Sequence, residues 1–270
     1  MEIISNYLKK INQSADIKTL LDVEKLIKNH LSKLTFCNIP VLLGKEISLD
    51  IANIYEKMVV KKEGGYCFEH NKLIYETLLS LGFEVKPLFG RVLHNAKADV
   101  PRTHRITLLT YQNEKYLVDV GFGPLTPNQP IKFGSTSTKT TLNASYVIHQ
   151  KDQETYELQM VLKNGLYTLY SFDLYNYNEM DYEVGNFYSY KHRDAFFVNN
   201  LIVSKILEDK TQYLWNNTYH EVFPEQKKER VVKSLDEFAD ILKSEFAYPI
   251  NDADIEFLFE KFVKQDNVNG

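Results

Sequence analysis

The spacing of the apolar residues changes near residue 84, and this change limits the folds that the chain can adopt. Before it, apolar side chains recur at helical intervals, as at Val23, Ile27 and Leu31. After it, short apolar runs rich in β-branched and aromatic residues alternate with polar turns, a pattern typical of strands. The sequence therefore predicts helices over residues 1–84, an antiparallel barrel or curled sheet over 85–190, and a mixed segment over 191–270.

Turn signals inside the strand region predict two hairpins. The polar run 112–115 and the dipeptide Asn164-Gly165, a strong signal for a type I′ turn, each separate two apolar segments. The strands expected around these turns cover residues 106–111, 116–120, 155–162 and 166–172.

The last segment mixes strand and helix signals. Ser234, followed three residues later by Glu237, resembles a capping box that opens a helix. The lone tryptophan, Trp215, is expected in the core of this segment. The strands expected here cover residues 201–206, 212–215 and 229–232.

Residues 63–71 (EGGYCFEHN) place Cys67 in the first turn of a predicted helix, whose apolar face includes Ile74 and Leu78 and which Gly82 ends. The unpaired N–H groups and the dipole of a helix start favour an anion, which lowers the pKa of a thiol. Cys67 is therefore a candidate nucleophile. The alternative is a buried thiol behind a glycine pair that only shapes the chain.

A cysteine nucleophile needs a base, and the base needs an orienting group. Of the seven histidines, His104 is the best placed, at the start of a predicted strand. Asp119 is a carboxylate within an apolar strand, so it needs a cationic partner if it is buried. A four-residue turn at 112–115 sets Asp119 opposite Leu108, roughly 13 Å along the sheet from His104. A bulge, a register shift or a longer loop must close that gap.

Composition narrows the classes of function. The net charge is −4 and no basic block stands out, which disfavours nucleic acid as a partner. No window approaches 18 apolar residues, so no membrane span is expected, and the N-terminal residues lack the apolar core of a signal peptide. The two cysteines, Cys37 and Cys67, are expected as thiols in a cytoplasmic protein. They and the histidines lack the spacing of metal ligands, so no metal is expected.

Taken in order, several motifs resemble those of the arylamine N-acetyltransferase family, and the resemblance covers nearly the full chain. Cys67, His104 and Asp119 each fall on a position of that family's catalytic triad. The segments that carry the resemblance are 7–11, 30–38, 63–71, 91–92, 103–104, 118–123, 186–197 and 234–246.

The resemblance implies an α+β fold with a cysteine-protease-like Cys-His-Asp core. A helical bundle over 1–84 would carry the cysteine, an antiparallel β-barrel over 85–190 the histidine and aspartate, and an α/β lid would span 191–270. It also implies a ping-pong reaction of xenobiotic metabolism: the acetyl group of acetyl-CoA passes through a thioester on Cys67 to an arylamine, arylhydrazine or N-hydroxyarylamine. No tightly bound cofactor is implied, and the protein would be a monomer or a weak homodimer.

The same resemblance assigns the remaining site residues. Thr103, Gly121, Phe122 and Gly123 are expected to contact the cofactor, with the N–H groups of the turn at 121–124 facing the CoA pyrophosphate. The acceptor pocket is expected to be lined by Phe36, Phe122 and Phe197.

Two positions depart from the family pattern near the nucleophile. The family usually has glutamate where Cys37 stands and arginine where Glu63 stands, and those two residues typically pair. We hypothesise that the two positions are neighbours here as well. A carboxylate at Glu63 close to Cys67 would raise the pKa of the thiol and slow its acylation.

Two other functions fit a cysteine, a histidine and an aspartate. A cysteine hydrolase of the papain or transglutaminase type uses the same groups, but His104 follows Cys67 by 37 residues (104 − 67), against about 130–150 in the papain pattern. A non-catalytic relative that binds CoA or another ligand is the second alternative, and such a protein needs none of the three residues.

Overall fold

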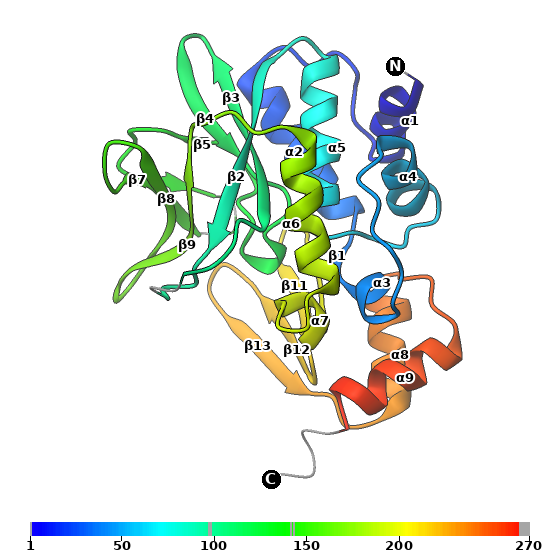
Figure 1. The fold of residues 1–270 in the computed structure, drawn as a ribbon. Helices are drawn as coiled ribbons and strands as arrows, with labels where there is room; N and C mark the ends of the chain where they lie inside the picture. The colour runs from blue at the N-terminus through cyan, green and yellow to red at the C-terminus, as the bar shows by residue number, and fades with distance from the viewer. Residues whose placement is uncertain (1, 97–98, 141, 143, 265–270) are drawn as a thin grey trace.

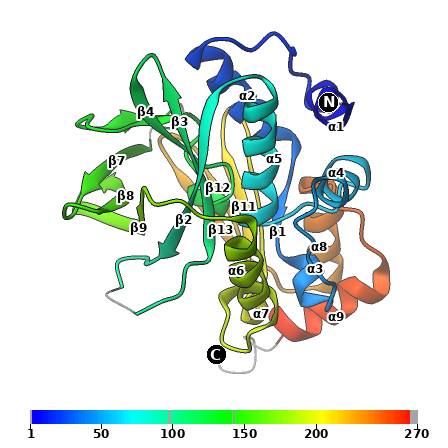
Figure 2. The ribbon, with the colours of Figure 1, turned by 45° about the horizontal axis from the view of Figure 1, so that its top comes forward.

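The computed structural model describes residues 2–96, 99–140, 142 and 144–264. Its N-terminal helices pack beside a strongly curved sheet, and a second sheet with two further helices lies below them (Figures 1 and 2). The helices before residue 84 are α1 (Glu2–Lys10), α2 (Leu20–Lys33), α3 (Ile39–Leu42), α4 (Ile51–Tyr55), the π-helical turn η1 (Glu56–Val60) and α5 (Cys67–Ser80).

Apolar stripes and side-chain caps determine where these helices lie. In α2 the predicted stripe is buried at Val23, Ile27 and Leu31, and the Thr19 hydroxyl accepts the N–H of Asp22 at the helix start. Burying this face against the neighbouring helices provides most of the stability that short helices lack in water. The helical periodicity before residue 84 is therefore confirmed.

The curved sheet contains eight strands within the described residues, in the order β5-β4-β3-β2-β9-β8-β7-β6, and every pairing is antiparallel. It is barrel-like, as the sequence predicted. Its strands are β2 (Glu84–Val92), β3 (His104–Tyr111), β4 (Glu114–Val118), β5 (Ile131–Lys132), β6 (Thr138–Lys139), β7 (Ser145–Gln150), β8 (Thr155–Leu162) and β9 (Gly165–Asp173); the 3₁₀ turn η2 spans Gly123–Leu125.

The first hairpin forms, but its turn is shorter than the sequence suggested. Only residues 112–113 connect β3 to β4, and both have positive φ (51° and 62°), as in a type I′ turn. In the resulting register Leu108 pairs with Leu117 and not with Asp119. Asp119 therefore lies two residues nearer to His104 than expected, which closes about half of the predicted gap.

The second hairpin also forms, with its turn shifted by one residue. Leu162 pairs with Gly165, so that Lys163 and Asn164 make the turn and Gly165 opens β9. The predicted pair of strands is thus present, whereas Asn164-Gly165 is not the central dipeptide.

The second sheet joins distant parts of the chain. Its order is β1-β10-β11-β12-β13, so β1, which comes from the N-terminal helical region, pairs with β10. The sequence did not predict β12, whose residues (TYHEV) are mostly polar. The strands are β1 (Phe36–Cys37), β10 (Ile202–Ile206), β11 (Thr211–Trp215), β12 (Thr218–Val222) and β13 (Lys227–Val231).

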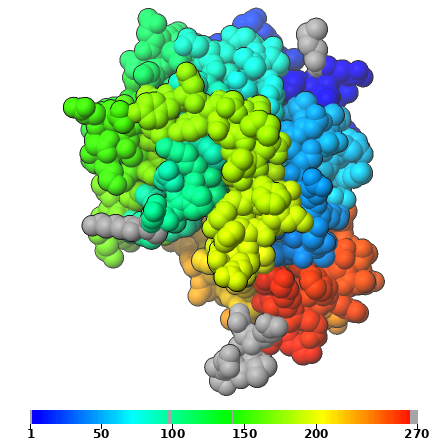
Figure 3. Space-filling model, viewed as in Figure 1, coloured from blue at the N-terminus to red at the C-terminus, as the bar shows by residue number. Residues whose placement is uncertain are grey.

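The remaining helices either connect the two sheets along the chain or follow the second sheet. A helix that the sequence did not predict, α6, runs between the barrel-like sheet and the N-terminal helices on the face shown in Figure 3. At α8 the Ser234 hydroxyl accepts the Glu237 N–H, which is half of the predicted capping box; the Glu237 carboxylate accepts the N–H of Lys233 and not that of Ser234. The helices are α6 (Glu179–Lys191), α7 (Phe196–Asn199), α8 (Leu235–Asp240), the π-helical turn η3 (Ile241–Glu245) and α9 (Asp252–Phe262).

Candidate active site

Cys67 is the first residue of α5 and is buried. The chain reaches it through Gly64, whose φ of 63° lies in the left-handed region. A side chain at position 64 would also bring its Cβ within 2.6 Å of the Thr35 carbonyl oxygen and 2.8 Å of Cys37 Sγ. Glycine at this position is therefore a steric requirement for the close packing of this segment against Thr35 and Cys37.

His104 and Asp119 meet at the end of the β3–β4 hairpin. His104 opens β3, Asp119 follows β4, and the His104 Nε2 lies 2.7 Å from Asp119 Oδ2. Both side chains are buried. The contact supplies the cationic or hydrogen-bonding partner that a carboxylate in an apolar strand requires.

Asp119 is held by four hydrogen bonds from different elements. Oδ1 accepts the Asn71 amide and the Gly121 N–H, both at 2.9 Å, and Oδ2 accepts the Tyr170 hydroxyl at 2.9 Å besides His104. Burial raises the pKa of Asp119, but His104 and these hydrogen bonds outweigh it, and the net direction is downward. Asp119 is therefore a carboxylate that fixes the His104 ring.

Asn71 connects the Asp119 carboxylate to α5. It lies one turn after Cys67 on α5, and its side-chain oxygen Oδ1 accepts the Val120 N–H at 3.0 Å while its side-chain Nδ2 donates to Asp119. A Cβ at Gly121 would lie 2.7 Å from the Asn71 amide nitrogen and 2.8 Å from the Cα of Cys67. Glycine at position 121 thus lets the strand end pack directly on the first turn of α5.

The surroundings of Cys67 disfavour the free thiolate. Burial raises the pKa of the thiol most, the charge of Asp119 raises it further, and the Phe68 N–H at the helix start opposes both. The expected lowering by the helix start is therefore outweighed. Because Cys67 and His104 line one cavity, a proton on His104 would provide the cation that a thiolate at Cys67 needs.

That cavity has a volume of about 570 Å³ and contains every cofactor and pocket residue that the sequence nominated. Phe122 packs edge-on against His104 with ring centroids 5.0 Å apart, and Phe36 lies 6.1 Å from Phe197. The nominated lining residues are Thr103, Gly121, Phe122, Gly123, Phe36 and Phe197.

The turn after Asp119 has already used two of its N–H groups. The Gly121 N–H donates to Asp119, and the Phe122 N–H donates to the Thr126 hydroxyl at 2.7 Å. These two N–H groups are therefore not free to donate to the CoA pyrophosphate, contrary to the expectation for this turn.

The structure adds site residues that sequence reasoning missed. Trp215 is 47% exposed and lines the cavity, so its placement in the core is wrong. It comes from β11 and lies beside Phe196 of α7, with ring centroids 6.3 Å apart. No sequence pattern indicated this, because it depends on how the second sheet packs. Asn71, by contrast, lies four residues after Cys67 and could have been found from helical spacing.

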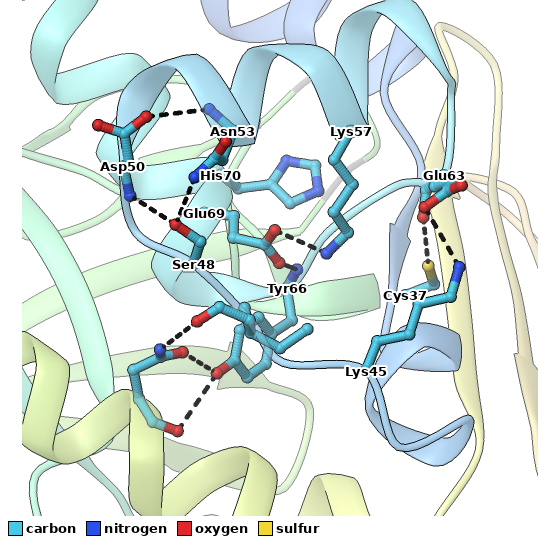
Figure 4. Close-up of polar contacts among 12 residues, drawn as sticks. Cys37, Lys45, Ser48, Asp50, Asn53, Lys57, Glu63, Tyr66, Glu69 and His70 are labelled. Carbon is cyan, nitrogen blue, oxygen red and sulfur yellow. Dashed lines mark hydrogen bonds and ion pairs between the residues drawn. The ribbon is translucent and has the colours of Figure 1, made fainter.

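Positions 37 and 63 are neighbours, as hypothesised (Figure 4). The Cys37 thiol donates to the Glu63 carbonyl oxygen at 3.5 Å, and burial raises the pKa of this thiol to about 12. The Glu63 carboxylate pairs with Lys45 at 3.5 Å. The acidic side chains that raise the pKa of Cys67 are Asp119 and Glu69. The pKa-raising effect that the hypothesis assigned to Glu63 therefore comes from Glu69.

Two general observations concern the described part of the chain. Within it, no helix has the length and apolarity needed to cross a membrane. The same residues contain no group of three or more His, Cys, Asp and Glu side chains arranged to hold a metal ion.

Comparison with known proteins identifies the family. A family model described as N-acetyltransferase matches residues 17–255. Arylamine N-acetyltransferase of Escherichia coli K12 is 36% identical over 209 residues, which cover 77% of this chain and 74% of that protein. The chain belongs to the arylamine N-acetyltransferase family. As a member of this family it is an acetyltransferase. The arylamine N-acetyltransferase / N-hydroxyarylamine O-acetyltransferase of Salmonella typhimurium is 33% identical over 73% of this chain and 70% of its own.

Solved arylamine N-acetyltransferases share the fold. The Salmonella typhimurium structure matches with a TM-score of 0.91 at 26% identity, covering 97% of this chain and 99% of that one. A Mycobacterium marinum arylamine N-acetyltransferase in complex with CoA matches with a TM-score of 0.89 at 26% identity, covering 96% and 99%. The fold class and family expected from the sequence are therefore confirmed.

Proposed function

We propose that this arylamine N-acetyltransferase moves an acetyl group from acetyl-CoA to a small aromatic amine through a thioester on Cys67. The observation that carries the proposal is the shared cavity: Cys67 and His104 both line it, and Asp119 binds His104 from behind at 2.7 Å. A buried thiol beside a carboxylate-bound imidazole is the arrangement that activates a cysteine for acyl transfer.

The first half-reaction loads the enzyme. Because Nε2 of His104 is bound to Asp119, Nδ1 is the nitrogen that exchanges a proton with the thiol. The Cys67 thiolate attacks the thioester carbonyl of acetyl-CoA, and the bond from that carbonyl to the CoA sulfur breaks. The proton held on His104 goes to the departing CoA sulfur. The products are acetyl-Cys67, neutral His104 and free CoA.

The second half-reaction transfers the acetyl group. The acceptor nitrogen attacks the carbonyl of acetyl-Cys67, and His104 takes the proton that this nitrogen loses. The bond from the carbonyl to Sγ breaks, which restores the thiolate and the imidazolium. Asp119 stabilises that imidazolium in both half-reactions and holds the ring in one orientation.

The shape and lining of the cavity support a flat aromatic acceptor. Phe36, Phe122 and Phe197 supply aromatic walls, and the volume of about 570 Å³ accommodates a small molecule beside the nucleophile. We propose arylamines, arylhydrazines and N-hydroxyarylamines as acceptors; the name of the Salmonella relative includes the first and the last of these classes. Thr103, Gly121 and Gly123 line the same cavity and are proposed to contact CoA, with the M. marinum complex as supporting precedent for CoA binding in this fold.

The intact mass of the protein tests the proposal. After brief exposure to acetyl-CoA without acceptor, the wild type is expected to gain one acetyl group and Cys67→Ala none. Addition of an arylamine should remove the adduct and yield the acetylated amine. An adduct that persists with arylamines, or that water removes at the same rate, would contradict amine transfer and favour a hydrolase. Absence of the adduct in a protein that binds CoA would favour a non-catalytic binder.

A further inference from the structure

A buried ion pair lies at the first turn of α5, and neither of its residues lines the cavity. The Lys57 ammonium of η1 contacts Glu69 Oε1 of α5 at 2.6 Å (Figure 4). Only 1% of the Glu69 side chain and 18% of the Lys57 side chain are exposed. A pair this deeply buried needs good geometry and further hydrogen bonds to be tolerated.

Glu69 supplies that further hydrogen bond at the start of the nucleophile helix. Its second oxygen, Oε2, accepts the N–H of Tyr66 at 3.2 Å, and Tyr66 is the residue immediately before Cys67. This is the reciprocal bond of a capping box, which satisfies a backbone donor that the helix cannot. The carboxylate of Glu69 therefore holds the residue on which the position of Cys67 depends.

The same carboxylate is unfavourable to the chemistry of Cys67. Its negative charge raises the pKa of the Cys67 thiol, in addition to the effects of burial and Asp119. The helix start thus requires an acceptor at position 69, whereas the nucleophile requires that this acceptor carry no net charge. The Lys57 ammonium meets both requirements, because it cancels the charge and leaves Oε2 on the Tyr66 N–H.

We propose that Lys57 is a positioning residue for the nucleophile: it holds the Glu69 carboxylate on the Tyr66 N–H and neutralises it beside Cys67. The inference rests on the proposed role of Cys67. Lys45 cannot replace Lys57, because Lys45 is half exposed and pairs with Glu63. Besides Cys67, four titratable groups interact with Lys57 or Glu69: Cys37 from β1, His70 from α5, Tyr66, and Tyr248 after η3. Asp119 acts on Cys67, and His104 lines the cavity with it.

The pH dependence of Cys67 alkylation by iodoacetamide, with the label located by peptide mass, tests the proposal. Lys57→Met should raise the midpoint by about half to one pH unit, which is a roughly three- to tenfold slower reaction below the midpoint. Single-turnover acetylation should slow by the same factor, with little change in the KM for acetyl-CoA. Lys57→Arg should stay near wild type, and Lys45→Met, the matched control, should leave the midpoint unchanged.

A charge-balanced double variant separates electrostatics from structure. Lys57→Met with Glu69→Gln removes both charges but keeps an amide oxygen for the Tyr66 N–H. This double variant should return most of the way to the wild-type midpoint, since a buried pair can be replaced by neutral groups at little cost. If the Lys57→Met single variant does not fold, the double variant can still be compared with the wild type.

Two results would overturn the proposal. One is a Lys57→Met protein with the wild-type alkylation midpoint, and the other is a double variant whose midpoint stays as high as that of the single variant. Failure of the wild type to form an acetyl adduct would instead count against the proposed function. The alkylation profile does not depend on acetyl transfer, so the two failures are distinguishable.

Discussion

The protein buries imidazoles in two places and uses them in opposite ways. His104 touches a carboxylate at 2.7 Å and lines a cavity. His30 and His70 instead bond to each other at 2.7 Å, with the Tyr7 hydroxyl at one end and the Thr35 carbonyl oxygen at the other. Burial lowers the pKa of both of these histidines, that of His70 to about 4. The two buried sites therefore differ in their partners: His104 is bound to a carboxylate, whereas His30 and His70 have only neutral partners.

In the His30–His70 pair, the direction of each hydrogen bond follows from the groups at the two ends of this hydrogen-bonded chain. The Thr35 carbonyl can only accept, so His70 Nε2 donates to it and His70 Nδ1 accepts from His30 Nε2. His30 Nδ1 then accepts the Tyr7 hydroxyl proton. Each ring thus has one fixed neutral tautomer, which ties α1, α2 and α5 together without charge. The comparison teaches that the carboxylate, and not the depth of burial, distinguishes the histidine that we propose to be catalytic from the neutral pair.

Removing the carboxylate should have the largest effect. In Asp119→Asn the amide retains the size of the side chain but removes the charge and allows the wrong His104 tautomer. We expect acetyl transfer (kcat/KM) to fall on the order of 10³- to 10⁴-fold with the fold intact by circular dichroism. A loss of less than tenfold would mean that His104 works without Asp119, and the contrast between the two sites would fail.

The second largest effect is expected in acid, where the His30–His70 pair should lower the free energy of unfolding. A histidine whose pKa is depressed on folding contributes its full stability above the unfolded value of about 6.5 and loses it as the pH falls toward the folded value. For His70, with a folded pKa of about 4, the free energy of unfolding should drop by about 3 kcal/mol between pH 6.5 and 4. Urea unfolding across this range measures the slope.

The matched variant for that experiment is His70→Leu. It should be less stable at neutral pH, because His30 and Thr35 lose a buried partner, but its stability should fall less steeply in acid. An acid slope equal to that of the wild type would show that His70 does not carry the pH dependence.

Loss of one bond to the carboxylate should have the smallest effect. Tyr170→Phe removes the hydroxyl that Asp119 Oδ2 accepts at 2.9 Å and leaves the other three hydrogen bonds. A hydrogen bond to a charged group contributes about 2 kcal/mol, and partial compensation should limit the fall in kcat to about tenfold. An effect as large as that of Asp119→Asn would show that the tyrosine, not the carboxylate alone, controls His104.

Much of this architecture follows from local patterns. The helical periodicity placed α2 and α5, and the motif around Cys67 placed this cysteine at a helix start, because these signals depend on residues close in sequence. The register of the first hairpin could not be obtained in this way. Its four polar residues include two that adopt left-handed conformations, and only the backbone reveals which two form the turn.

The parts that resisted prediction depend on tertiary packing. Trp215 lines the cavity because β11 belongs to a sheet whose first strand comes from the other end of the chain. Tyr170 reaches Asp119 from β9, 51 residues away in sequence. Lys57 and Glu69 were both visible as charged residues, but neither spacing nor composition indicates that Glu69 would be almost completely buried.

The cavity wall formed by the two-residue strand β1 depends on a strand from the last third of the chain. Phe36, one of the aromatic walls of the cavity, pairs with Ser204 of β10 on one side and bridges to Gly65, just before the nucleophile, on the other. On a ribosome, Cys67, His104 and Asp119 all emerge before the strand that secures this wall. If these residues act as proposed, a growing chain holds its reactive groups before it holds the complete wall of the acceptor pocket.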